Sequence, residues 1–325
     1  MSEQSTVDIL GEPWRVETIP LDDDFEGEVV ATLVSRRRDD AGDPATDRAT
    51  LHVHGFSDYF FHTEYGAWWL DRGRDMYALD LRKYGRSIRP HQSATYVADL
   101  EEYFAELDAA WERITVRDGH RDVVLTGHST GGLIVALWAD ARKPAELSGL
   151  VLNSPWLDLQ GKAVVRSPVA NVIVDQVGRR QPLRELGRDV SGYYARSLHR
   201  DHEGEWEFDL TWKPVESYPV RFGWLRAIRR GHARLQAGLA VPAPVLVLSS
   251  DRSGRPQGMD DEQVFTTDIV LDVRQIRRWS TAIGPHVTYA AVPGAVHDVV
   301  LSRPEARARA YDEIGRWLMA YVDGR

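Results

Sequence analysis

The sequence contains no cysteine among its 325 residues. Disulfide bonds, thiolate metal ligands and a cysteine nucleophile are therefore excluded, and any covalent mechanism must use another side chain. Long apolar runs are also absent, because no uninterrupted stretch approaches the roughly 18 residues of a membrane-spanning helix. The start of the chain, Met1 to Ser5, lacks the basic-then-apolar pattern of a secretory leader. We therefore expect a cytoplasmic protein without an integral membrane segment.

An excess of positive charge is missing as well. Lys and Arg number 40 against 49 Asp and Glu, which gives a formal net charge of −9. Because nucleic-acid affinity depends on neutralising phosphates with basic side chains, we expect no nucleic-acid partner. The glycine-rich segment 127–132 matches neither a dinucleotide fingerprint nor a Walker loop, so we expect no cofactor. The hydrophobic fraction of 43% and the charged fraction of 27% are typical of a folded globular chain.

The most informative segment reads Gly-His-Ser-Thr-Gly-Gly and places Ser129 at its centre. The apolar run 122–126 before it predicts a strand, and the apolar run 133–139 after it predicts a helix. A serine on such a sharp strand-to-helix turn needs strained backbone angles, and the turn brings backbone so close that Gly127 and Gly131 must lack side chains. The pattern predicts a nucleophile elbow.

Short strands alternate with helices along most of the chain, which predicts an α/β fold with a mostly parallel, doubly wound sheet. Two antiparallel strands are expected first, at 14–21 and 28–35. The further expected strands lie at 49–55, 75–80, 122–126, 147–153, 245–249 and 286–292, and the expected helices include 64–72, 96–113, 133–139 and 304–322.

The alternation stops after Pro155 and resumes near residue 242. This interruption is far longer than an ordinary loop and is rich in aromatic residues, so we expect an inserted lid, called the cap here, at 156–241. The core is then formed by 1–155 and 242–325. Within the cap, 169–177 and 220–237 are expected to be helical, and 202–212 is expected to form a short strand or an extended loop.

Serine is a weak nucleophile at neutral pH, so Ser129 needs a base, and that base needs an acid to orient it. His297 follows the last expected strand, and Asp251 ends the strand before it, so the carboxyl ends of the sheet would gather both near Ser129. Asp251 is the favoured acid, and Asp268 and Asp272, which also precede His297, remain alternatives.

A tetrahedral intermediate needs backbone donors for its oxyanion. We expect one from the amide of Thr130 at the helix N-terminus and the other from the turn after Gly55, at Phe56. His52 and His54 alternate on a strand and could suggest a metal pair, but no third spaced ligand accompanies them. His54 is expected instead to brace the turn by hydrogen bonding.

With these residues in place, the chain resembles the α/β-hydrolase superfamily, and within it the monoacylglycerol lipase and lysophospholipase group, which is also described as serine aminopeptidase S33-like. The resemblance is carried by the segments 54–59, 80–87, 127–132, 152–158 and 292–298. It implies a triad of Ser129, Asp251 and His297 with an oxyanion hole at Phe56 and Thr130. One departure is the long segment between Asp251 and Asp268.

The resemblance implies a serine hydrolase without a metal or cofactor. Its expected substrate is a small acyl ester, such as a monoacylglycerol or a lysophospholipid, because an aromatic cap would bury an acyl chain. An aminopeptidase or amidase remains an alternative, since the cap carries four acidic residues, Glu203, Glu205, Glu207 and Asp209. A catalytically inactive binding protein with the same fold is the third alternative.

Overall fold

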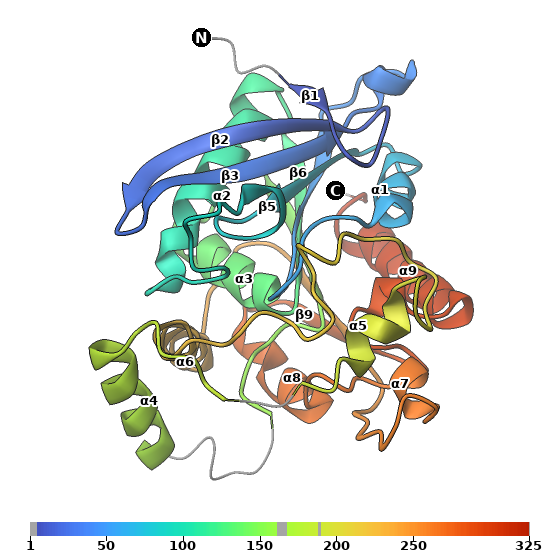
Figure 1. Ribbon diagram of the computed structural model, residues 1–325. Coiled ribbons are helices and arrows are strands. Elements are labelled where there is room, and N and C mark those ends of the chain that lie inside the picture. Colours follow the sequence, from blue (N-terminus) through green and yellow to red (C-terminus); the bar gives the residue numbers. More distant parts are fainter. Residues whose placement is uncertain (1–4, 161–167, 188–189, 325) are drawn as a thin grey trace.

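A nine-stranded sheet forms the centre of the computed structural model, which describes residues 5–160, 168–187 and 190–324 (Figure 1). The spatial order of the strands is β1-β2-β3-β5-β4-β6-β7-β8-β9. The strands are β1 (Thr6–Val7), β2 (Arg15–Asp24), β3 (Gly27–Arg36), β4 (Arg48–Val53), β5 (Asp75–Asp80), β6 (Asp122–His128), β7 (Leu147–Asn153), β8 (Val245–Ser250) and β9 (Val287–Val292).

The direction of the strands agrees with the predicted class. The pairs β1–β2, β2–β3 and β3–β5 are antiparallel, whereas every neighbour from β5 through β4 to β9 is parallel. Helices connect the parallel strands, as crossovers in such a sheet require. The prediction of an α/β fold with a mostly parallel sheet is confirmed.

Helices cover both faces of this sheet (Figure 1). They are α1 (Thr63–Leu70), α2 (Phe104–Glu112), α3 (Thr130–Arg142), α4 (Pro168–Arg180), α5 (Tyr193–Leu198), α6 (Phe222–Gln236), α7 (Gln263–Thr266), α8 (Val273–Trp279) and α9 (Pro304–Tyr321). None of the helices in the described ranges is long and apolar enough to span a bilayer.

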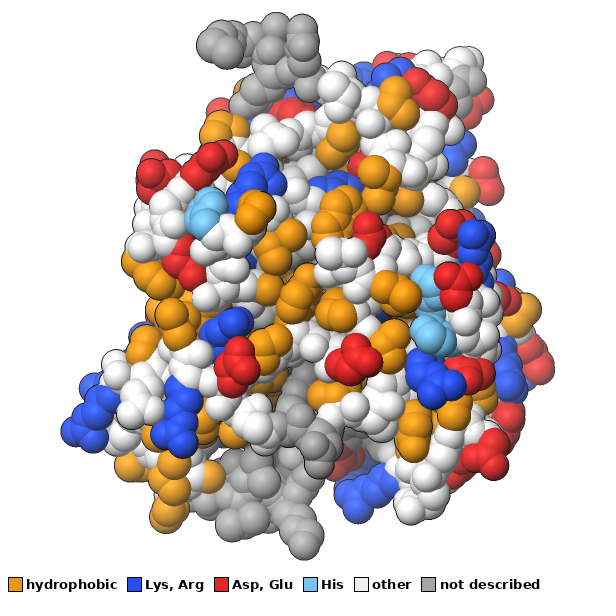
Figure 2. Space-filling model, in the orientation of Figure 1, with side chains coloured by type: hydrophobic (Ala, Val, Ile, Leu, Met, Phe, Trp, Pro, Cys, Tyr) orange, Lys and Arg blue, Asp and Glu red, His pale blue; other side chains and the backbone are white. Residues whose placement is uncertain are grey.

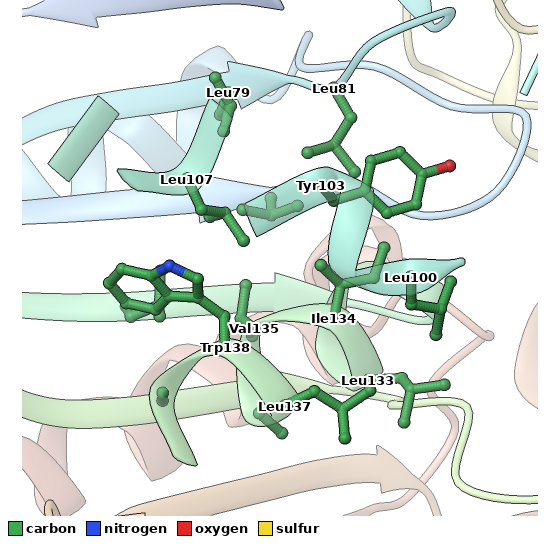
Figure 3. Packing of buried hydrophobic residues seen from close by; sticks show 14 of the residues in the cluster. Leu79, Leu81, Leu100, Tyr103, Leu107, Leu133, Ile134, Val135, Leu137 and Trp138 are labelled. Atoms are coloured by element: carbon green, nitrogen blue, oxygen red, sulfur yellow. The ribbon is translucent and has the colours of Figure 1, made fainter. Parts of the chain in front are cut away.

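Side chains that alternate along the central strands pack into two separate cores. On β6, Val123 and Leu125 join the cluster under α2, α3 and α6, while Val124 joins the cluster under α1 and α9. Figure 3 shows part of the first cluster, in which leucine and aromatic side chains of α3 face those before and within α2. A strand buried on both faces explains why the segment before Ser129 reads as a continuous apolar run.

The expected helix at 96–113 differs from the structure at its start. A 3₁₀ turn over Leu100–Tyr103 precedes α2, because Asp99 caps it and Glu102 returns a hydrogen bond to the cap backbone. Residues before this capping box are therefore outside the helix.

Three helices of the described chain, α4, α5 and α6, lie between β7 and β8, within the range expected for the cap. The helix α6 packs on α3, and a Cβ added at Gly231 would lie 3.3 Å from Leu137 of α3. Residues 202–212 form turns with one isolated bridge between His199 and Trp206, not a strand. The division into a core and a cap at 156 and 241 stays a prediction.

Charged side chains of both signs are interspersed over the face of the molecule shown in Figure 2. Among the described residues on that face, no continuous basic surface is seen. Most surface arginines of the cap and of α9 instead pair with nearby carboxylates, for example Arg200 with Glu207 and Arg309 with Glu305.

Candidate active site

Ser129 occupies the turn between β6 and α3 with a strained backbone. Its φ is 52° and its ψ is −116°, a combination that L residues rarely adopt and that is maintained only where the surroundings enforce it. A Cβ on Gly127 would lie 2.7 Å from Val135, and one on Gly131 would overlap the carbonyl oxygen of His54. The two glycines are therefore required by the close approach of the backbone, as the sequence pattern predicts.

Ser129, His297 and Asp268 form a continuous chain of hydrogen bonds. Ser129 Oγ lies 3.0 Å from His297 Nε2, and His297 Nδ1 lies 2.9 Å from Asp268 Oδ2. Because a carboxylate only accepts, Nδ1 carries the ring proton, and Nε2 is left to accept from the serine hydroxyl. All three residues are buried, so little water competes for these contacts.

The structure corrects the expectation for Asp251. The carboxylate of Asp251 is partly exposed and accepts a hydrogen bond of 3.3 Å from Gly294 N, and it does not contact His297. Asp272 is not the partner either, since it caps α8 by accepting from Arg274 N. Asp268 takes the position beside the histidine.

The path of the chain after β8 explains why Asp268, and not Asp251, contacts His297. Residues 252–267 leave the sheet and return, so that Asp268 pairs with the segment just after Asp251. Gly254 N donates to Asp268 O at 2.9 Å, and Asp268 N donates to Arg252 O at 3.1 Å. The second carboxylate oxygen of Asp268 accepts from Val270 N and Leu271 N, which fixes the rotamer. The Gly-, Pro- and Asp-rich composition of 252–267 is the one sequence signal of this excursion.

The turn expected to supply an oxyanion donor lies against Ser129. A Cβ on Gly55 would be 3.1 Å from Ser129 Cβ, and the next residue, Phe56, lines the same cavity as Ser129. Thr130 is the first residue of α3, where a backbone amide has no partner within the helix. Both predicted donors are thus adjacent to Ser129.

His54 stabilises the turn after Gly55 through two hydrogen bonds. Its Nε2 accepts from Leu81 N at 3.0 Å, so its Nδ1 carries the proton and donates to Gly55 O at 2.8 Å. Burial lowers the pKa of His54, which keeps the ring neutral and this pattern intact. His52 contacts Thr126 Oγ1 instead, and the described residues contain no group of three metal-ligating side chains.

A buried carboxylate that the sequence did not single out as functional lies behind the site. Asp298 accepts from Asn153 Nδ2 at 2.6 Å and from His62 Nε2 at 3.1 Å. Burial opposes its ionisation, but His128 and His62 outweigh burial and hold the pKa of Asp298 well below its usual range. The partners lie far away in the sequence, so only the folded chain reveals this network.

The ring of His128 lies close both to this carboxylate and to the ring of His297. The ring centroids of His128 and His297 are 4.8 Å apart. Burial lowers the pKa of His128 to about 4, so this ring is neutral near pH 7.

A cavity of about 300 Å³ opens at Ser129 and His297. One part of its wall is apolar and is formed by Val215, Ile269 and Val270. Another part is polar and includes Ser57, Asp58, Gln160, Ser191, Lys213 and Ser217. The cap and the core both contribute to this wall, so the site can receive a molecule with an apolar and a polar portion.

Comparisons with known proteins agree with this architecture. In a search of solved structures, a monoacylglycerol lipase from Paleococcus ferrophilus has a TM-score of 0.60 at 20% identity, covering 84% of this chain and 94% of that one. A soluble variant of monoglyceride lipase from Saccharomyces cerevisiae, bound to a substrate analogue, has a TM-score of 0.65 at 16% identity, covering 94% and 96%. At these identities the likeness shows the fold.

Similar curated sequences match over shorter stretches. Phospholipase YtpA of Bacillus subtilis is 32% identical over 114 residues, which are 34% of this chain and 41% of the relative. A 1-acylglycerol-3-phosphate O-acyltransferase, ABHD5 of Sus scrofa, is 33% identical over 109 residues, 32% of this chain and 28% of the relative. The chain thus spans less than half the length of either relative.

The family comparison covers most of the chain. The model described as serine aminopeptidase, S33, matches residues 44–303, a range that includes the strained serine, the buried histidine and the acid that contacts it. By this match and by its fold, the chain belongs to the serine aminopeptidase S33 family of α/β-hydrolases.

Proposed function

We propose that this chain hydrolyses carboxylic esters through an acyl-enzyme intermediate on Ser129. The observation that carries the proposal is the buried hydrogen-bond chain from Ser129 through His297 to Asp268. In this arrangement a histidine can remove the serine proton while a carboxylate stabilises the imidazolium that forms.

The reaction proceeds in two halves. Ser129 Oγ attacks the ester carbonyl as His297 Nε2 takes the hydroxyl proton, and the carbonyl oxygen becomes an oxyanion facing the amides of Phe56 and Thr130. The intermediate collapses, and His297 gives the proton to the leaving alcohol. A water molecule then loses a proton to His297 and attacks the acyl group. The second tetrahedral intermediate breaks its bond to Ser129 Oγ as His297 returns the proton to that oxygen, which releases the acid.

The substrate proposed is a small acyl ester with a polar alcohol, such as a monoacylglycerol or a lysophospholipid. The cavity wall supports it, because Ile269 and Val270 can contact an acyl chain while uncharged polar residues of the wall, such as Gln160 and Ser191, can face the alcohol. The names of similar proteins, a phospholipase and two monoacylglycerol lipases, point in the same direction. At about 300 Å³ the cavity is at the small end of ligand sites, so acyl chains of modest length are expected to bind best.

An aminopeptidase would need a free acidic group for the substrate's amino terminus. Glu203, Glu205 and Glu207 pair with surface arginines and do not line the cavity. Asp58 does line it, but its carboxylate is paired with Lys213. These contacts favour the ester.

Hydrolysis of a p-nitrophenyl ester series of increasing acyl length, compared with a panel of aminoacyl anilides, tests the proposal. We expect kcat/KM for the esters to rise with acyl chain length and to fall once the cavity is full. Each buried methylene is expected to contribute roughly 0.8 kcal/mol to binding of the transition state. Ser129→Ala is the matched control. Cleavage of the anilides in preference to the esters would favour the peptidase, and hydrolysis of neither would favour the inactive binding protein.

A further inference from the structure

The turn that follows Gly55 is held by the cap. Consecutive side chains of this turn each accept one hydrogen bond from the cap: Ser57 Oγ from Tyr218 N at 3.0 Å, Asp58 Oδ1 from Lys213 Nζ at 2.6 Å, and Tyr59 Oη from Asp209 N at 2.6 Å. These residues directly follow Phe56, the proposed oxyanion donor. The cap residues 209–218 are therefore attached to the turn at several points in a row.

The pair of Asp58 and Lys213 is buried. Their side chains are only 3% and 6% exposed. Burial acts to raise the pKa of Asp58, but Lys213 and nearby histidines outweigh it and lower that pKa to about 2, so the carboxylate is ionised. Because transfer of two charges out of water offsets most of their attraction, such a pair adds little stability and instead fixes a geometry.

The turn that this pair holds lies next to Ser129 and His297. Asp58 and Lys213 line the same cavity as Ser129 and His297. Ser57, between Phe56 and Asp58, has a φ of 52°, so the turn does not adopt a relaxed conformation by itself. Contacts from outside the turn must hold it.

We propose that Lys213 and Asp58 are a positioning pair that aims the backbone N–H of Phe56 at the oxyanion. This inference rests on the proposed function and adds that the cap, through Lys213, sets the geometry of the oxyanion hole. An oxyanion donor acts on the charge that develops in the transition state, so its misplacement lowers kcat and leaves KM almost unchanged. Lys213 Nζ donates to Asp58, so the role proposed for it is to position the turn.

The variants Lys213→Met, Asp58→Asn and the double variant test the proposal. Each single change leaves one buried charge without its partner and is expected to lower Tm strongly, whereas the double change removes both charges and is expected to restore Tm. In the double variant we expect kcat to stay about 10- to 100-fold below wild type with KM within about two-fold. Recovery of both Tm and kcat would overturn the proposal. A raised KM with unchanged kcat would also overturn it, because the pair would then bind substrate.

Hydrogen exchange followed by mass spectrometry gives a readout that does not depend on activity. In the double variant, peptides covering 55–60 are expected to exchange faster together with those covering 209–218. The matched control is Arg200→Met with Glu207→Gln, which removes an exposed pair of the cap. Unchanged exchange at 55–60 would overturn the positioning role of Lys213 and Asp58. If exchange is faster in the double variant but the wild type hydrolyses no ester, the pair holds the turn and the proposed function is rejected.

Discussion

Asp268 Oδ2 lies 2.9 Å from His297 Nδ1, although the residue that directly follows β8, and so occupies the expected position of the acid, is Asp251. The acid reaches the histidine from the far end of a long excursion of the chain. Its carboxylate is fully buried, and two backbone amides hold the oxygen that does not contact His297. The acid that we propose for the triad thus comes from a different point in the sequence than expected.

Asp268→Asn is expected to reduce kcat by roughly 10³- to 10⁴-fold with the fold intact, because an amide cannot both hold the tautomer and stabilise the imidazolium. The matched variant Asp251→Asn is expected to keep wild-type turnover. Steady-state kinetics on a p-nitrophenyl ester measure both. A loss in Asp251→Asn as large as that in Asp268→Asn would contradict the geometry described here.

We expect the protein to lose stability in mild acid because of His232 in α6. It is buried between Trp156 O and Arg229, and burial, aided by Arg229, lowers its pKa to about 3 from an ordinary 6.5. Between these values the unfolded chain binds a proton that the folded chain does not, so stability falls as the pH decreases. The histidine accounts for a loss of about 2 kcal/mol between pH 7 and pH 5.

Urea unfolding of wild type and His232→Gln at both pH values measures this loss. Glutamine can still donate to the carbonyl of Trp156 but does not titrate. We expect a smaller decrease in the variant, and equal decreases in the two proteins would show that His232 does not carry the effect.

Two glycines on helices are expected to respond oppositely to alanine. Gly131→Ala would place a Cβ on the carbonyl oxygen of His54. We therefore expect this variant to lose activity and to have a free energy of unfolding that is lower by several kcal/mol. Gly315→Ala in α9 meets only ordinary contacts, the nearest at 3.6 Å, and should stabilise the helix by up to about 1 kcal/mol. Thermal unfolding compares them, and a stable, active Gly131→Ala would refute the crowding of the elbow.

Asp298→Asn is expected to destabilise the protein by about 1–3 kcal/mol, because the amide nitrogen must face one of the donors that Asp298 now satisfies. Those donors include Asn153 Nδ2, His62 Nε2 and Val300 N. Asp23→Asn on the exposed hairpin is the control, with an expected change within about 0.5 kcal/mol. Equal free energies of unfolding in urea for wild type and Asp298→Asn would show that the hydrogen bonds to this carboxylate do not stabilise the fold.

The sequence predicts the features that short segments encode. The strands, the elbow at Ser129 and its two glycines are local patterns, and the mostly parallel direction of the sheet follows from the alternation of strands with helices. His297 could be proposed because chain order and the sheet edge restrict its position. Asp268 could not be preferred to Asp251, since the choice depends on how residues 252–267 return to the sheet. The contacts of Asp298 and Lys213 could not be predicted from the sequence, because their partners lie more than a hundred residues away.

The central claim is that Ser129 is the nucleophile, and covalent labelling tests it most directly. A fluorophosphonate probe is expected to add once per chain, with peptide mapping placing the adduct on Ser129 and Ser129→Ala showing neither adduct nor ester hydrolysis. Ester hydrolysis at the wild-type rate by Ser129→Ala, or an adduct on another residue, would contradict the account.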